Sequence, residues 1–179
     1  MFSAVFISFA ALSSNFFLLV VAAQRSWVSS VWSLSPAVPP CPRSWHHWGS
    51  SCYLVTESQV AWSSARDECA KLGGILAVPH SPEEDGFIAS LIPPKTGAWI
   101  SCSDLVTEGI WECKEGDVEV SYRNWDEGLH QPSGGNAENC AVISTWYGPP
   151  FKWHDYSCTR NTEHAVCKQP AVTKPLLHL

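Results

Sequence analysis

The apolar positions between residues 56 and 73 repeat with the period of an amphipathic helix. Spaced at helical intervals, they predict one buried face made of Ala61, Ala65, Cys69 and Leu72. Thr56 and Gln59 have the spacing of a capping box, which places the start of the helix just after Thr56. Gly73 follows the last apolar position and can end the helix in the left-handed conformation. We therefore expect a helix in this segment, with Cys69 directed into the core.

A second helix is predicted between Ser81 and Pro93. Ser81 is a suitable N-cap, Pro82 suits the first helical position, and Glu84 completes a capping box with Ser81. The apolar positions of this segment are Phe87, Ile88 and Leu91. Gly86 weakens the helix, and Pro93 ends it.

Beyond residue 94 the pattern changes to short β-type runs separated by Gly, Pro, Asn and Asp. The runs are AWISCSD, GIWECKE, VEVSYRNW, NCAVIS, FKWHDYSC and HAVCKQ. Upstream, a hairpin is expected around the Gly49-Ser50-Ser51 turn, with His46 and His47 at the surface. Because the predicted helices come before most of the short predicted strands along the chain, we expect an α+β domain with an antiparallel sheet.

The two ends of the chain differ in composition from the segment between them. Residues 1–23 carry no charged side chain and end in Val-Ala-Ala, which predicts a signal peptide cleaved before Gln24. An uncleaved membrane anchor is the alternative, but Ser and Asn interrupt the apolar run and Arg25 lies on its far side. Residues 24–40 are rich in Ser and Pro and indicate a linker, residues 41–169 indicate one domain, and residues 170–179 indicate a C-terminal tail.

Composition narrows the class of protein. The chain has 179 residues, of which 45% are hydrophobic, enough for one compact core. Eight cysteines behind an export signal predict four disulfides in a secreted, extracellular protein. A zinc site is disfavoured because the sequence has no Cys-x-x-Cys or His-x-x-x-His pair. A net charge of −6 without a basic run argues against nucleic acid and against insertion into a membrane.

Residues 126–139 form a polar segment too rich in Gly and Asn for regular structure, and a loop is expected there. Oxygen donors in and near this loop are Gln131, Ser133, Glu138 and Asp155. Calcium binds several such oxygens at once, and a bridge between Cys140 and Cys158 would hold the two acidic ends together. The alternative is that these side chains are ordinary solvated polar groups.

The segments described above resemble a C-type lectin-like domain of the long form. The resemblance extends over residues 41–169 and is carried by CPRSWHHWGSSCY, AWSSARDECAKLGGILAV, Trp99-Ile100, Trp111, Asn124-Trp125, Glu138-Asn139-Cys140, Trp153-His154-Asp155 and Cys167. It implies two helices packed on antiparallel sheets, with a long ligand-binding loop. It also implies four bridges, which are Cys41–Cys52, Cys69–Cys167, Cys140–Cys158 and, for the remaining pair, Cys102–Cys113.

The same resemblance implies a site for calcium and sugar. Sugar-binding members carry Glu-Pro-Asn or Gln-Pro-Asp in the loop, then a Glu before a framework cysteine, then Asn-Asp after a strand Trp. The matching calcium ligands here are Gln131, Ser133, Glu138, His154 and Asp155, with a cis bond expected between Gln131 and Pro132. Ser133 is shorter than Asn or Asp, and His154 offers an imidazole nitrogen, which calcium does not favour. We therefore expect weaker calcium binding than in a member with the full pattern.

In this family a tripeptide that begins with Gln goes with galactose-type sugars. Galactose-binding members also usually present an aromatic ring to the sugar, and Trp146 and Tyr147 in the neighbouring loop are candidates. The expected carbohydrate-binding residues are Gln131, Ser133, Glu138, Asp155, Trp146 and Tyr147.

Two functions remain once an enzyme is set aside. A glycosidase pair of Glu138 and Asp155, or a Ser-His-Asp triad, is disfavoured because the sequence has no nucleophile elbow and no zinc-hydrolase motif. The first function is a secreted, calcium-dependent carbohydrate-binding protein. The second is a lectin-like domain that has lost sugar binding and recognises a protein or other ligand without calcium.

Overall fold

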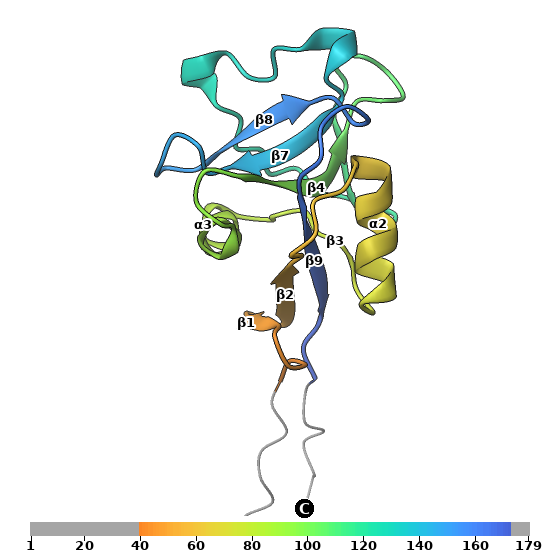
Figure 1. The fold of residues 1–179 in the computed structure, drawn as a ribbon, viewed down its shortest axis with the longest axis vertical. Helices are drawn as coiled ribbons and strands as arrows, with labels where there is room; N and C mark the ends of the chain where they lie inside the picture. The colour runs from red at the N-terminus through yellow and green to blue at the C-terminus, as the bar shows by residue number, and fades with distance from the viewer. Residues whose placement is uncertain (1–39, 173–179) are drawn as a thin grey trace, which may run out of the picture. The chain divides into compact units, whose positions relative to one another are not determined.

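The computed structural model describes residues 40–172 (Figure 1). The expected signal peptide, residues 24–39 of the expected linker and residues 173–179 of the expected tail lie outside the described residues. The strands are β1 (His46–Trp48), β2 (Ser51–Val55), β3 (Ile75–Leu76), β4 (Gly97–Ser103), β5 (Glu112–Glu115), β6 (Val118–Glu119), β7 (Cys140–Ser144), β8 (Lys152–Tyr156) and β9 (His164–Pro170). The two α-helices are α2 (Trp62–Lys71) and α3 (Pro82–Leu91). Between residues 40 and 172, no helix has the length and apolar character to cross a membrane.

The last strand, β9, joins the two halves of the fold. Strands follow the order β1-β2-β9-β4-β5-β6, while β3 pairs with β9, β7 with β4, and β8 with β7. The strand pairs are antiparallel except for a short parallel contact between β4 and β9, where Ala98 pairs with His164 and Trp99 with Ala165. The expected α+β fold with antiparallel sheets is thus confirmed, with this one parallel contact added.

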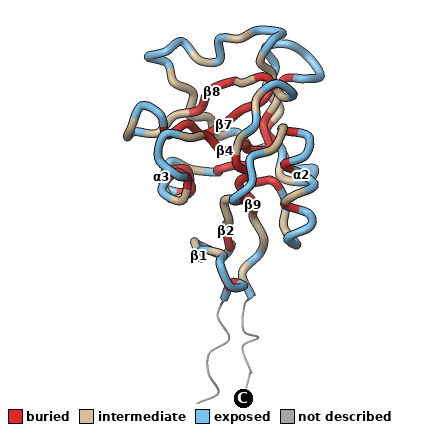
Figure 2. The backbone as a smooth tube through the Cα atoms, viewed as in Figure 1, coloured by how far each residue is buried: buried red, intermediate tan, exposed pale blue. Residues whose placement is uncertain are grey.

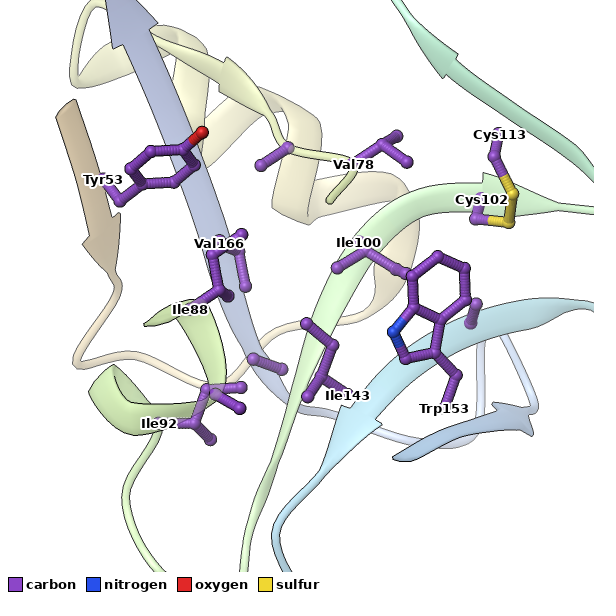
Figure 3. Packing of buried hydrophobic residues seen from close by; sticks show 14 of the residues in the cluster. Tyr53, Val78, Ile88, Ile92, Ile100, Cys102, Cys113, Ile143, Trp153 and Val166 are labelled. Atoms are coloured by element: carbon purple, nitrogen blue, oxygen red, sulfur yellow. A yellow bond between two sulfur atoms is a disulfide. The ribbon is translucent and has the colours of Figure 1, made fainter. Parts of the chain in front are cut away.

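Strand β9 separates two hydrophobic clusters because successive side chains leave a strand on opposite faces. Val166 belongs to the first cluster, which includes Ile88 of α3 and Trp153 of β8 (Figure 3). Cys167 belongs to the second, with Ala65 and Cys69 of α2. The two helices flank β9 from opposite sides (Figure 1), and the buried backbone concentrates on the central strands (Figure 2).

Helix α2 begins later than the capping pattern predicts. Its N-cap is Ala61, without a side-chain hydrogen bond, so the predicted capping box of Thr56 and Gln59 is wrong. Thr56 Oγ1 instead accepts a hydrogen bond from the backbone N–H of Ala165 at 2.8 Å, which holds this segment extended beside β9. The C-terminal prediction is confirmed, since Gly73 has a φ of 81°. Cys69 is buried as expected, whereas Leu72 is 44% exposed.

Helix α3 has the predicted N-cap but uses Glu84 differently. The backbone N–H of Glu84 donates to Ser81 Oγ at 3.2 Å, and Pro82 is the first helical residue. The Glu84 carboxylate accepts from the backbone N–H of His80 at 2.9 Å, one residue before the position that a capping box requires. Its other oxygen accepts from the Tyr53 hydroxyl. The Glu84 side chain therefore forms a tertiary contact in place of the predicted capping box.

Other local expectations are met in part. Trp48 pairs with Ser51 across the first hairpin, Gly49 has a φ of 56°, and His46 and His47 are exposed. The run VEVSYRNW forms only the two-residue strand β6, because the chain beyond it turns away to contact α3. The loop expected to lack regular structure contains two short 3-10 helices, Glu127–Leu129 and Gly135–Ala137.

All eight cysteines form disulfides in the pairing that the resemblance implies. The bridges are Cys41–Cys52, Cys69–Cys167, Cys102–Cys113 and Cys140–Cys158. Strand β9 continues one residue past the expected domain end, since Pro170 pairs with Ser51.

Candidate functional site

The loop of residues 126–139 lies alongside β8, the outer strand of the sheet that β8 forms with β7 and β4, and much of it is exposed (Figure 2). Its first residue is tied to β8, because the backbone N–H of Asp126 donates to the carbonyl of Trp153 at 3.1 Å. Asp126 Oδ1 then accepts from the backbone N–H of Leu129, which closes the first 3-10 turn. The bridge between Cys140 and Cys158 lies at the other end of the loop.

Asp155 is the centre around which the loop folds. It lies on β8, is 2% exposed, and accepts hydrogen bonds from two loop amides, the N–H of Ser133 at 2.9 Å and of Gly134 at 2.7 Å. Its own backbone N–H donates to Gln131 Oε1 at 3.2 Å. The Gln131 amide in turn donates to Ser133 Oγ at 3.2 Å, and the Gln131-Pro132 bond is cis, as expected. The structure therefore brings three of the expected residues into one hydrogen-bonded group.

Glu138 lies next to this group and packs against Gly134. A Cβ added to Gly134 would lie 2.3 Å from Glu138 Cβ, so the absence of a side chain at position 134 lets Glu138 fold there. Burial raises the pKa of Glu138, and the negative charge of Asp155 raises it further, while Arg160 partly opposes the shift. Two carboxylates thus lie close enough to repel each other, which is an environment that favours a bound cation.

His154 has contacts of its own, outside the hydrogen-bonded group around Asp155. It pairs with Val142 in the β7–β8 ladder, whereas Asp155 pairs with Ala141, and neighbouring strand residues point to opposite faces. The His154 imidazole is 3.4 Å from Asp126 Oδ2 and stacks on the Tyr147 ring at 5.6 Å between centroids. Burial lowers its pKa and the nearby Asp126 opposes that shift, which favours a neutral ring.

The aromatic candidates lie on the loop after β7. Trp146 is 55% exposed and Tyr147 is 73% exposed, so both rings are open to a ligand. Tyr147 is held by its stacking on His154, which gives its ring a defined orientation.

Sequence reasoning did not single out a second polar cluster on the other side of the loop. Asn139 donates from its side-chain amide to Asp104 Oδ1 at 3.0 Å and to Glu108 Oε2 at 3.2 Å. Asp104 is 3% exposed and also accepts from the backbone N–H of Gly109. The available signal was the spacing of Asp104 and Glu108, four residues apart, upstream of the Glu138-Asn139 pair. These contacts fix the end of the loop that carries Glu138.

The donor chemistry of the first group suits calcium. Its side chains supply carboxylate, amide and hydroxyl oxygens, and calcium accepts six to eight such ligands, including backbone carbonyls and water. Within residues 40–172, no three His, Cys, Asp or Glu side chains gather into a ready-made metal cluster. Any ion here would therefore depend on the neutral oxygens of Gln131 and Ser133 as well as on the two carboxylates.

Comparison with known proteins gives a consistent result. Residues 58–169 match the model of the Lectin C-type domain. The galactose-specific lectin nattectin of Thalassophryne nattereri is 36% identical over 112 residues, which cover 59% of this chain and 67% of nattectin. The crystal structure of the cow C-type carbohydrate-recognition domain of CD23, determined in the presence of a GlcNAc2Man3 oligosaccharide, is 30% identical with a TM-score of 0.65. The alignment covers 76% of this chain and 100% of that domain.

A further similar structure is that of a protein described as calcium-independent. A calcium-independent type II antifreeze protein is 25% identical with a TM-score of 0.66, and the alignment covers 76% of this chain and 99% of that protein.

Proposed function

The chain belongs to the C-type lectin domain family, and on that premise we propose that it is a secreted, calcium-dependent carbohydrate-binding protein with a preference for galactose-type sugars. The observation that carries the proposal is the convergence of Gln131, Ser133 and Asp155 in one hydrogen-bonded group beside Glu138. Lectin domains of this family generally bind carbohydrate without turning it over, and binding without catalysis is proposed here too. Four disulfides support an extracellular location, because such bridges persist in oxidising compartments.

Calcium would be held by the oxygens of Gln131, Ser133, Glu138 and Asp155, with His154 as the fifth candidate. When bound, the ion would supply an electrophilic centre at which two neighbouring sugar hydroxyls replace water. The carboxylates of Glu138 and Asp155 can accept hydrogen bonds from those hydroxyls, and the Gln131 amide can donate one. The same side chains would thus hold the ion and orient the sugar.

The preference for galactose-type sugars rests on Gln131 and on the aromatic loop. The Gln-first tripeptide is the family pattern for such sugars, and the similar protein nattectin is described as galactose-specific. Tyr147 is the better placed of the two rings to cover the apolar face of the sugar, since stacking on His154 holds it. Trp146 extends the same exposed surface.

A second function is favoured by one observation. Both carboxylate oxygens of Asp155 already accept backbone hydrogen bonds from the loop, so the loop has partners that do not require an ion. A domain built in this way can recognise a protein or other ligand without calcium. Its structural similarity to a calcium-independent antifreeze protein is compatible with that alternative.

Retention on immobilised galactose and mannose, with calcium or with chelator, tests the proposal. We expect retention on galactose that calcium supports and chelator abolishes. Glu138→Gln removes one of the two negative charges and should weaken calcium binding about tenfold or more, measured by calorimetry. Glu127→Gln is the matched control, because Glu127 is an exposed carboxylate of the same loop. Equal retention with calcium and with chelator would refute the calcium dependence, and no retention on either sugar would favour the second function instead.

The part played by position 154 can be tested separately. His154→Asn replaces an imidazole nitrogen with an amide oxygen, the donor that sugar-binding members of the family carry. If position 154 contributes a ligand, calcium affinity should rise in the variant. Unchanged calcium affinity would show that His154 supports the loop by contacting Asp126 and Tyr147 and does not bind the ion.

A further inference from the structure

A pocket lies at the opposite end of the domain from the ligand loop. It has a volume of about 550 Å³ and is formed where β1, β2 and β9 meet the turn after α2, at the lower end of the domain in Figure 1. None of the residues expected to bind calcium or sugar lines it. A cavity of this size can hold a small organic ligand.

The polar wall of this pocket is a cluster of partly buried charged side chains. Lys168 Nζ lies 3.2 Å from Glu84 Oε1 and 2.8 Å from Glu115 Oε1. Glu84 is 3% exposed, and the side chains of Lys168 and Glu115 are 13% and 16% exposed. His80 Nε2 lies 3.2 Å from Glu115 Oε2 at the rim. The Tyr53 hydroxyl donates a hydrogen bond to Glu84. Burial is the main cause that raises the pKa of Tyr53 and this hydrogen bond is the second, so the phenol stays neutral.

The charges of this cluster do not balance. Among the residues that line the pocket, the two carboxylates of Glu84 and Glu115 face one lysine ammonium, with the His80 imidazole at the rim. Burying charged groups is unfavourable, and apolar residues of similar volume would stabilise a fold equally well or better. An acidic, partly buried cluster at the wall of an open pocket is therefore a candidate binding site.

The rest of the lining combines apolar residues with Ser50, Ser51 and Gln169. The Trp48 ring lines the pocket and stacks on Phe87 with 6.0 Å between centroids and 25° between planes. Ile75 is 46% exposed at the edge. Gly74 is required where the walls meet, because a Cβ there would lie 2.8 Å from the carbonyl oxygen of Lys168. An aromatic face beside excess negative charge is complementary to a cation with an apolar body.

We propose that this pocket binds a small organic ammonium or guanidinium ligand, with its charge at Glu84 and Glu115 and its apolar body against Trp48. The carboxylates keep unused lone pairs after accepting from Lys168, His80 and Tyr53, and a ligand N–H group would donate to them. The inference is independent of calcium and of the sugar site.

Benzylamine and its neutral analogue benzyl alcohol provide the direct test, followed by NMR through the indole N–H of Trp48. Benzylamine should shift this signal with a dissociation constant on the order of a millimolar, and benzyl alcohol should bind about tenfold more weakly. Both titrations are run with calcium and with chelator, and the results should agree. Equal affinity for the amine and the alcohol would overturn the proposal, because an apolar cavity alone would then explain the binding.

A conservative substitution localises the charge. Glu115→Gln keeps the shape of the side chain and should weaken benzylamine binding about tenfold, with little effect on benzyl alcohol. Glu112→Gln is the matched control, since Glu112 belongs to the same strand, is 40% exposed in its side chain and does not line the pocket. The same loss in both variants, or no loss in either, would refute the assignment of the ammonium to this cluster.

Discussion

At the scale of single residues, Asp85 links helix α3 to the strand that carries the candidate site. It is 2% exposed and accepts hydrogen bonds from Trp153 Nε1 at 2.8 Å and from Asn124 Nδ2 at 2.5 Å. Burial raises the pKa of Asp85, although these hydrogen bonds oppose the shift. The burial of Tyr122 and the negative charge of Asp85 raise the pKa of Tyr122 to about 12. Asp85 therefore supports β8 while being less easily ionised than an exposed aspartate.

The variant Asp85→Asn should lower the free energy of unfolding, because its amide would place a donor against the Asn124 donor. The expected loss is about 1–3 kcal/mol. A raised folded pKa means that the contribution of Asp85 is full below the unfolded pKa and declines as pH rises through the folded pKa. The difference in unfolding free energy between parent and variant should therefore shrink as pH rises above about 4, the ordinary pKa of an aspartate, measured by urea unfolding. A difference in unfolding free energy that does not change with pH would contradict the raised pKa of Asp85. Asp117→Asn is the control, because Asp117 is exposed.

At the scale of elements, helix α3 shows how a capped start can offset a weak interior. Ser81 and Pro82 fix its first turn, and three acidic residues, Glu83, Glu84 and Asp85, lie near its positive end. Gly86 follows directly and contributes no packing, since a Cβ there would have no heavy atom within 4 Å. The helix is held mainly by its cap and by the burial of Ile88 and its neighbours.

Gly86→Ala should raise the free energy of unfolding by about 0.5–1 kcal/mol, because alanine has the higher helix propensity and meets no obstacle. Gly73→Ala is the matched comparison: it also has open space around the added Cβ, but its φ is 81°. Alanine in this left-handed conformation should lower stability by about 1–2 kcal/mol. Thermal unfolding of the two variants checks the opposite signs. A destabilised Gly86→Ala protein would mean that the helix is constrained by something other than propensity.

At the scale of the whole molecule, the disulfides differ in how much chain they enclose. Cys69–Cys167 joins α2 to β9 across a sequence separation of 98, whereas Cys102–Cys113 joins neighbouring strands across a separation of 11. All four of these cysteines are 0% exposed, so their removal leaves comparable cavities. The difference between them therefore isolates the effect of loop length on the unfolded chain.

Replacing both cysteines of a bridge with alanine should lower the free energy of unfolding by about 4–5 kcal/mol for Cys69–Cys167 and by about 3 kcal/mol for Cys102–Cys113. The reason is that the longer loop loses more conformational entropy when it is closed in the unfolded state. Denaturant unfolding of the two double variants measures the difference. Equal losses would show that native packing, and not loop closure, sets the contribution of these bridges.

The sequence by itself determined the local features of this protein. Helical periodicity, the Ser81 cap, the turn at Gly49 and the left-handed Gly73 depend on neighbours in the chain, so they could be predicted. The resemblance of residues 41–169 to a family then supplied the disulfide pairing and the donors around Asp155. Spacing alone could not have selected that pairing.

Only the tertiary structure decided which residues far apart in the chain form hydrogen bonds with each other. Thr56 is drawn to Ala165, and Glu84 to Tyr53 and Lys168, because long-range hydrogen bonds outcompete the local caps that the sequence favours. Strand pairing sends His154 and Asp155 to opposite faces, which adjacency in the sequence conceals. The residues that line the pocket beside Lys168 come from segments far apart in the chain. No local sequence pattern predicts this pocket, because its formation depends on how β9 packs between the two halves of the fold.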